Sequence, residues 1–311
     1  MTNLDRATTL ATASDAKYFH LLKGLVRSVA RDETASRLAL SVLDLGLSGE
    51  QLAWLRGQGA GIAPAGWDIE FPGMETLPGH FRAMLARPFL PRYFPGHDIY
   101  IWIDADTWIQ DGTVLNHYQR AARDGKLAIV PELDRSYFTM YKRPRIFGWN
   151  GAYRGYRFAF GFRVANRMAG KPFLNAGVFA LHKDSPHWDL YERNLTHALN
   201  RRGRPEVRAD NGGWLIEQSA LNHVVYMDKA PTSLLPAYCN WFCALGTPHY
   251  DRERGCLVEP NEPHRPIGIV HLAGKDVQER AFELPIRGRD GETVSTTLTH
   301  EAIRSLNENR G

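Results

Sequence analysis

The chain of 311 residues contains only three cysteines, Cys239, Cys243 and Cys256. A small, odd number of cysteines in a long chain does not suit a disulfide framework and fits a reducing compartment. No stretch approaches the roughly 18–20 uninterrupted apolar residues of a membrane-spanning helix, and the N-terminus lacks the regions typical of a signal peptide. These absences favour a cytoplasmic protein. Peripheral contact with the inner face of a membrane is left open.

Three glycine-containing motifs are also missing: G-x-S-x-G, G-x-x-x-x-G-K and G-x-G-x-x-G. Their absence argues against a serine hydrolase, a P-loop enzyme and a dinucleotide-dependent oxidoreductase. The chain has 38 Lys and Arg against 34 Asp and Glu, which leaves a net charge of only +4. We therefore expect no nucleic-acid partner. The length is enough for one large α/β domain or two small ones.

The most informative stretch is a run of five strand formers, Ile99–Ile103, followed by Asp104-Ala105-Asp106. An apolar, β-branched and aromatic run without polar alternation predicts a strand buried on both faces. Two Asp residues at positions i and i+2 point to the same side if the backbone stays extended. The pair could hold Mg²⁺ or Mn²⁺. A simple strand-end turn is the competing interpretation, because Asp is common in turns.

Strands and helices alternate from the start of the chain. Residues 8–13 form a predicted strand, 18–30 a helix and 38–45 a second strand, and Ser48 with Gln51 predicts a capping box at a second helix. This order is typical of an α/β, Rossmann-like fold with a mostly parallel central sheet flanked by helices. Further predicted strands cover residues 67–71, 127–131, 173–181 and 267–272, and further predicted helices cover 80–89, 113–124, 187–199, 214–225 and 299–307.

Residues 135–171 differ in composition, with nine Lys and Arg, ten aromatic residues and no Asp or Glu. One hypothesis is a solvated basic segment whose aromatic side chains pack on the core. The other is a binding segment for an anionic or sugar-like partner, or for an anionic membrane surface. Composition alone does not separate them.

Several separated segments together resemble one family. They are Ala13-Ser14-Asp15 with Tyr18, then Arg87, Asp104-Ala105-Asp106, Asn175-Ala176-Gly177-Val178, Glu217-Gln218 with Leu221-Asn222, and His271 with Gly274. In this order they resemble glycosyltransferase family 8, the retaining family of the GT-A fold that includes glycogenin and lipopolysaccharide galactosyltransferases. The resemblance covers about residues 8–277. It implies a domain over 1–280, with 281–311 as a C-terminal tail and helix.

The resemblance assigns roles by position. It implies that Asp104, Asp106 and His271 hold Mn²⁺ or Mg²⁺ against the diphosphate of a UDP-sugar. Gln218, Glu217 and Arg87 would act around the anomeric carbon and the leaving phosphate. The donor site it implies also contains Ala13, Asp15, Tyr18, Ala105, Asn175, Ala176, Gly274 and Lys275.

The implied activity is the transfer of a hexose from a UDP-sugar to a hydroxyl of a glycan, lipopolysaccharide-like or protein acceptor. The chain departs from the family at Val277, where the family has Lys, and at Glu217, where it usually has Asp. An acceptor carboxylate is expected at Glu132 or Asp134. Two alternatives stay open: a sugar-nucleotide or glycan-binding module without turnover, and a GT-A-fold nucleotidyltransferase. The second usually has a Gly-rich first loop, and residues 12–18 contain no Gly.

Overall fold

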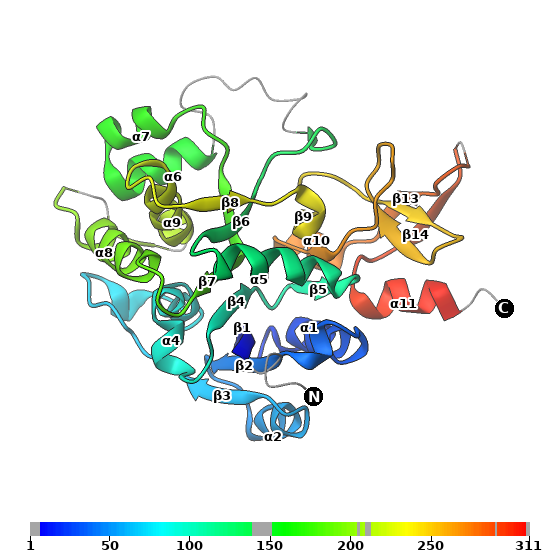
Figure 1. The fold of residues 1–311 in the computed structure, drawn as a ribbon, viewed down its shortest axis with the longest axis horizontal. Helices are drawn as coiled ribbons and strands as arrows, with labels where there is room; N and C mark the ends of the chain where they lie inside the picture. Colours follow the sequence, from blue (N-terminus) through cyan, green and yellow to red (C-terminus); the bar gives the residue numbers. More distant parts are fainter. Residues whose placement is uncertain (1–6, 139–150, 204–205, 209–212, 290, 309–311) are drawn as a thin grey trace.

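The computed structural model describes residues 7–138, 151–203, 206–208, 213–289 and 291–308. Its centre is a sheet in the order β3-β2-β1-β4-β7-β6-β8 (Figure 1). β7 runs antiparallel to both of its neighbours, and the other adjacent pairs are parallel. The strands of this sheet are β1 (Thr8–Ser14), β2 (Ala39–Asp44), β3 (Gly61–Pro64), β4 (Ile99–Ile103), β6 (Leu127–Pro131), β7 (Leu174–His182) and β8 (Thr232–Leu234).

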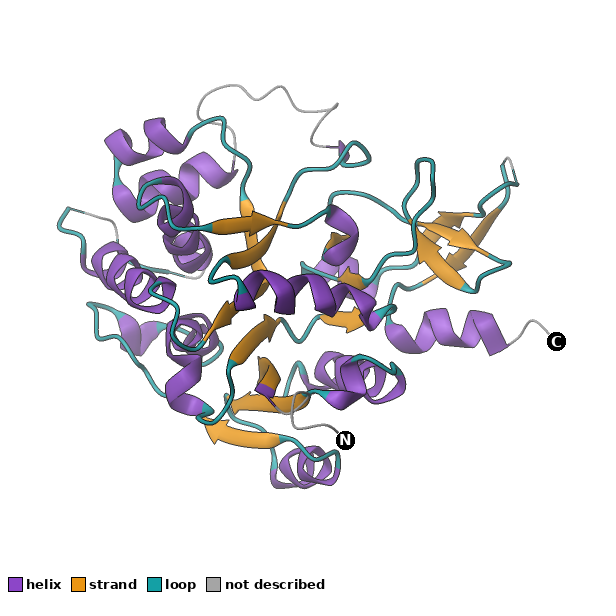
Figure 2. Cartoon of the chain, in the orientation of Figure 1, coloured by secondary structure: helices purple, strands orange, loops and turns teal. Residues whose placement is uncertain are grey.

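Helices lie on both sides of the sheet (Figure 2). The α-helices of the described residues are α1 (Phe19–Arg31), α2 (Gly49–Gly57), α3 (Phe81–Ala86), α4 (Leu90–Tyr93), α5 (Leu115–Arg123), α6 (Gly151–Phe160), α7 (Phe162–Met168), α8 (His187–Asn200), α9 (Ile216–Tyr226), α10 (Lys275–Glu279) and α11 (His300–Glu308). The predicted mostly parallel sheet flanked by helices is therefore confirmed.

β4 is buried on both faces, as its sequence predicts. Tyr100 and Trp102 pack with α3, α8 and α9 on one face. Ile99, Ile101 and Ile103 pack with α1, α2 and α5 on the other. Because strand side chains alternate between faces, a fully apolar run fills two cores at once. This fixes the position of the residues that follow Ile103.

Local signals locate the first helices well. Ser48 accepts a hydrogen bond from the Gln51 backbone, and the Gln51 side chain accepts one from the Ser48 backbone, which confirms the capping box. The predicted helix over residues 80–89 is present as α3, from Phe81 to Ala86, and is continued by a 3-10 turn from Arg87 to Phe89. Pro91 does not stop the chain from turning helical again, because it lies in the first turn of α4, where its missing N–H costs nothing.

The strand predicted over residues 67–71 is wrong. The strand in this region is β3, which pairs in parallel with β2 from Ser41 to Asp44. Ile69 and Phe71 are buried in the same cluster as α3 and α8, but their backbone joins no sheet. Alternating apolar residues indicate burial of alternate side chains, and here side-chain packing supplies that burial without strand pairing.

The C-terminal third adds smaller sheets. β5 (Thr107–Ile109), β12 (Ile269–His271) and β9 (Trp241–Phe242) form a three-stranded sheet. β10 (His249–Asp251) pairs with β11 (Cys256–Val258), and β13 (Phe282–Pro285) pairs with β14 (Thr293–Thr296). Leu284 and Ile303 share one buried cluster with Trp108 of β5. The division of the chain at residue 280 stays a prediction.

The described part of the basic segment separates its aromatic side chains from its charges. Tyr153 and Tyr156 are buried, whereas Arg154 and Arg157 on the same helix, α6, are exposed. Tyr141, Lys142, Arg143, Arg145 and Trp149 lie outside the described residues. Among the helices of the described ranges, none combines the length and the apolar character that crossing a bilayer requires.

Leu284→Ala tests how firmly the C-terminal hairpin is attached. Leu284 is fully buried, and large-to-small changes at such sites cost about 2–5 kcal/mol. We expect the midpoint of urea unfolding to fall, with a single transition. Glu283→Ala, next to it on the exposed side of β13, should have a much smaller effect. An unchanged midpoint for Leu284→Ala would mean that the hairpin does not share the core.

Candidate active site

The D-x-D segment lies where the chain passes from one sheet to another. Asp104 follows the last residue of β4, and β5 begins at Thr107. β5 pairs antiparallel with β12, and this register sets His271 opposite Thr107. The backbone N–H of Leu272 donates to the carbonyl of Asp106 at 2.9 Å. Two strands that are far apart in the sequence thus bring His271 beside the two carboxylates.

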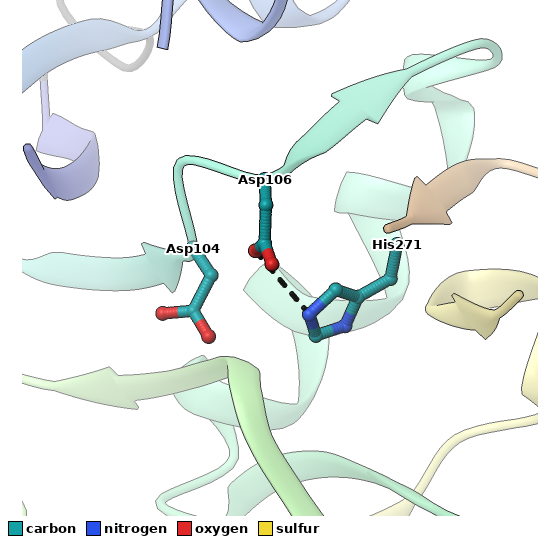
Figure 3. A group of neighbouring side chains, drawn as sticks. All are labelled: Asp104, Asp106 and His271. Atoms are coloured by element: carbon teal, nitrogen blue, oxygen red, sulfur yellow. Dashed lines mark ion pairs between the residues drawn. The ribbon is translucent and has the colours of Figure 1, made fainter. Parts of the chain in front are cut away.

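Asp104, Asp106 and His271 point toward one another (Figure 3). One ligand atom from each lies within 4.8 Å of the others, and His271 Nε2 is 3.5 Å from Asp106 Oδ1. Two carboxylate oxygens and an imidazole nitrogen suit a divalent cation. An imidazole favours Mn²⁺ over Mg²⁺, which prefers oxygen ligands alone. The three residues fit the metal site that the sequence suggests.

Residues outside this group hold each of the three side chains through one of its atoms. Asp104 Oδ1 accepts hydrogen bonds from Arg87 Nη2 at 2.6 Å and Trp102 Nε1 at 2.7 Å. Asp106 Oδ2 accepts one from Gln278 Nε2 at 3.1 Å. Asn240 Oδ1 lies 3.0 Å from His271 Nδ1. Outer partners of this kind orient metal ligands. The atoms left facing one another are Oδ2 of Asp104, Oδ1 of Asp106 and Nε2 of His271, of which the last two lie 3.5 Å apart.

Gly177 forms the floor of this group. A Cβ atom at this position would lie 2.4 Å from Cε1 of His271 and 2.8 Å from Oδ2 of Asp104. β7 leaves its pairing with β6 here, since Ile129 lies opposite Phe179 but Val130 lies opposite Asn175. Such bulges often re-aim side chains beside functional sites. The space next to the three side chains therefore exists only because residue 177 has no side chain.

Arg87 joins two carboxylates in the interior. Its Nη1 donates to Glu217 Oε2 at 2.5 Å, and its Nη2 reaches Asp104. Its guanidinium also lies 4.8 Å from the centre of the Trp102 ring. Burial raises the pKa of Glu217 to about 7, although the charge of Arg87 acts to lower it. Within the described part of the chain, the buried Oε1 of Glu217 has no hydrogen-bond partner.

Glu132 contacts two further site residues, Asn175 and Gln218. Its Oε1 accepts hydrogen bonds from Asn175 Nδ2 and Gln218 Nε2, both at 3.0 Å. Burial raises the pKa of Glu132, and these two donors partly oppose the shift. Asp134 instead accepts from the backbone N–H of Ser136. Of the two carboxylates considered in the sequence, Glu132 is the one in contact with other site residues.

The pKa values of Asp104, Asp106 and His271 shift in different directions, because burial and the neighbouring charges act against one another. Burial raises the pKa of Asp104, and the neighbouring Asp106 adds to the shift. Burial alone would also raise the pKa of Asp106, but His271 and Gln278 outweigh it and lower that pKa. Burial acts to lower the pKa of His271, but the carboxylates prevail and raise it. A divalent cation would relieve the repulsion between the two Asp side chains.

Of the residues expected on the nucleotide side, Ala13, Asp15 and Tyr18 lie at or just after the end of β1. Ala13 is buried in β1. Asp15 Oδ1 accepts a hydrogen bond from the Tyr18 backbone at 3.0 Å, so it shapes the turn before α1. Ala105 lies between the two metal-facing Asp residues, and Ala176 is buried between Asn175 and Gly177.

The residues after His271 include Val277, the position at which the chain departs from the family pattern. Gly274, at φ +99°, precedes α10. Val277, where the family has Lys, is buried. The Lys275 side chain is exposed and lies 3.9 Å from Glu279. The side chain of α10 that reaches the metal-facing group is Gln278, through Asp106.

A cavity of about 300 Å³ adjoins this group on the side of α1. It is lined by Ala105 and Asp106, and also by Lys23 and Arg27 of α1 and by His300 of α11. Arg27 forms an ion pair with Glu301 at 3.0 Å across this region. The D-x-D turn therefore borders both this cavity and the group formed by Asp104, Asp106 and His271.

The site also contains three residues that were not predicted from the sequence: Asn240, Gln278 and Trp102. Asn240 lies between two short elements of the C-terminal third, where nothing local distinguishes it from a turn residue. Gln278 directly follows Val277, the position at which the chain departs from the family, and the sequence gives no reason to single out Gln278 itself. Trp102 is a core residue of β4 whose Nε1 happens to face Asp104. Only the folded arrangement reveals these contacts.

No protein-family model matches the chain, and no curated protein matches it in sequence. Solved structures do match. The galactosyltransferase LgtC, in complex with donor and acceptor sugar analogues, superposes with a TM-score of 0.51 at 15% identity, covering 96% of this chain and 95% of LgtC. An active-site mutant of LgtC gives 0.51 at 14% identity, covering 86% and 87%. The bifunctional glycosyltransferase WbbM gives 0.51 at 14% identity, covering 88% of this chain and 47% of WbbM.

The chain therefore has the fold of these glycosyltransferases, the GT-A fold, and the fold class expected from the sequence is confirmed. At this level of identity the likeness shows the fold alone. The arguments for activity come from the residues gathered at the D-x-D segment.

Gly177→Ala tests the metal-facing group directly. The added methyl group would occupy the space between His271 and Asp104, so we expect Mn²⁺ binding, measured by electron paramagnetic resonance, to fall at least tenfold. Gly49→Ala is the matched control, because nothing lies within 4 Å of its added Cβ. Equal Mn²⁺ affinity in the Gly177 variant and wild type would place the metal elsewhere.

Proposed function

We propose that the protein is a retaining, metal-dependent glycosyltransferase of family 8 that transfers a hexose from a UDP-sugar to an acceptor hydroxyl. The observation that carries the proposal is the group Asp104, Asp106 and His271, which offers one ligand atom from each residue within 4.8 Å of the others, after the end of β4 in a GT-A fold. Ligands of α/β sheets bind beyond the carboxyl ends of the strands. The likeness to LgtC and WbbM supports the same class of reaction.

Asp104, Asp106 and His271 would hold Mn²⁺ or Mg²⁺. Bound there, the cation would neutralise charge on the departing diphosphate. Arg87 adds a fixed positive charge beside Asp104, and its buried contacts with Glu217 and Trp102 keep it in place. A preorganised cation stabilises a leaving group without reorganisation during the reaction.

Ala13, Asp15, Tyr18 and Ala105 would form the uridine side of the donor site, at the end of β1 and beside the D-x-D segment. Asn175 and Ala176 precede Gly177 in β7 and would lie next to the donor sugar. Gly274 and Lys275 would approach the diphosphate from the start of α10. The exposed Lys275 side chain can turn toward it, because its contact with Glu279 is only a surface ion pair.

Glu132 and Gln218 would position the acceptor and the reacting sugar. Their mutual hydrogen bond fixes both side chains, and Asn175 adds a second donor to Glu132. The raised pKa of Glu132 suits a carboxylate that accepts a hydrogen bond from an acceptor hydroxyl. Gln218 would lie beside the anomeric carbon.

Retention of configuration allows two routes. One forms a covalent intermediate, for which Glu217 is the candidate nucleophile because its Oε1 is unpartnered and buried beside Arg87. The other is attack on the front face with the diphosphate as base. Both routes need Arg87 in place.

Glu217→Gln probes the first route. The change removes the carboxylate and weakens the anchor of Arg87, so we expect kcat to fall about 100-fold or more. Mn²⁺ affinity should stay within a few-fold, because Glu217 is not a ligand. Glu217→Asp, which keeps the charge, is the control and should retain more activity than the amide. Undiminished turnover by the Gln variant would exclude a covalent route through this residue.

The main experiment is release of UDP from a panel of UDP-sugars, with and without Mn²⁺. We expect one sugar to be hydrolysed only with the metal, and Asp106→Asn to be inactive because one metal-facing oxygen is lost. UDP binding without turnover of any sugar would favour the binding-module alternative. Release of diphosphate from a sugar phosphate and UTP would favour a nucleotidyltransferase.

The acceptor and the cellular location of the protein are part of the same proposal. The acceptor would be a glycan or another hydroxyl compound, and residues 135–171 would lie on its side of the site. Peripheral contact with an anionic membrane would use the exposed Arg154, Arg157, Arg163 and Arg167 of α6 and α7. The three free cysteines support a cytoplasmic location.

A further inference from the structure

A chain of buried hydrogen bonds runs from the backbone of β7 to the ring of His271. The backbone N–H of Gly177 donates to Asn175 Oδ1 at 2.9 Å. Nδ2 of Asn240 donates to the same oxygen at 3.0 Å, and Oδ1 of Asn240 lies 3.0 Å from His271 Nδ1. Asn240 and His271 are each only 2% exposed, so water does not compete for these contacts.

The first member of the chain fixes the direction of all the others. A backbone N–H can only donate, so Asn175 must turn its oxygen toward Gly177. Asn240 meets that same oxygen and must present its NH₂ group there. Its carbonyl oxygen then faces His271, and Nδ1 of the ring has to carry a proton to complete the contact. The other end of Asn175 agrees, because its NH₂ group donates to Glu132.

We propose that Asn240 is a positioning residue that holds His271 in the Nδ1–H tautomer, so that Nε2 keeps its lone pair for the metal. In the opposite tautomer, Nε2–H would point at Asp106 Oδ1, 3.5 Å away, and would occupy the place of the cation. Second partners of metal-bound imidazoles fix the tautomer in this way. The metal part of this inference rests on the proposed function, whereas the tautomer does not.

The tautomer can be observed without metal or substrate. Long-range ¹H–¹⁵N spectra of histidine-labelled protein distinguish protonated from unprotonated ring nitrogens. They are recorded at a pH high enough that the signals of His271 no longer change with pH, so that its ring is neutral. His271→Gln identifies the signals of His271 among the 12 histidines. We expect a protonated Nδ1 and an unprotonated Nε2. A protonated Nε2 in the wild type would overturn the proposal.

Metal affinity tests the role of Asn240. Asn240→Leu removes the acceptor for Nδ1–H, and outer partners of this kind are typically worth about 10–100-fold in metal affinity. Asn240→Asp keeps an acceptor oxygen and should bind Mn²⁺ more tightly than the Leu variant. Asn194→Leu is the matched control, since Asn194 is 5% exposed in α8 and is hydrogen-bonded to Asp228. It should leave the affinity unchanged.

The outcomes separate the two proposals. Wild-type affinity in a folded Asn240→Leu variant would show that Asn240 does not position His271, whatever the enzyme does. If that variant does not fold, the wild-type spectrum and the Asp variant decide. A wild type with Nδ1–H but no Mn²⁺ binding would keep the tautomer and remove the metal from the proposed function.

Discussion

Two half-buried carboxylates beside one another are unstable unless other groups share their charge, and this constraint governs the site. An unpaired charge in the interior costs several kcal/mol. Asp104 meets it with Arg87 and Trp102, and Asp106 meets it with Gln278. Each partner takes one oxygen and leaves the other, so the groups that make burial tolerable also decide which atoms remain for a cation.

Arg87 links this constraint to the rest of the site. It is 7% exposed, and it is hydrogen-bonded to Asp104 from β4 and Glu217 from α9, two elements that approach from different parts of the chain. A rigid guanidinium can satisfy two carboxylates at fixed angles, which Lys cannot do. Asp104 of the candidate metal site and Glu217 are therefore held in one arrangement.

The sheets place these residues by long-range pairing. β4 ends the parallel half of the central sheet, β5 joins a smaller sheet, and β7 bulges where Asn175 and Gly177 lie. The registers of β5 with β12 and of β4 with β7 put His271 and Gly177 beside the same turn. A small shift in either register would separate the ligands.

The sequence could predict the local parts of this arrangement. The strand Ile99–Ile103, the capping box at Ser48 and the D-x-D segment depend on neighbouring residues, and His271 was found through a resemblance in residue order. Asn240 could not be found, because its partners Asn175 and His271 are 65 and 31 residues away. The choice of Glu132 over Asp134 likewise depends on Gln218, 86 residues away. The strand at 61–64 was missed because packing, not pairing, buries the alternating residues 67–71.

Crystals of the protein soaked with Mn²⁺ and UDP would test the central claim most directly, through anomalous diffraction. The account predicts a single strong anomalous peak at coordination distance from Oδ2 of Asp104, Oδ1 of Asp106 and Nε2 of His271, with the diphosphate on its open side. A peak elsewhere, or coordination through Asp106 Oδ2 or the other ring nitrogen, would contradict it.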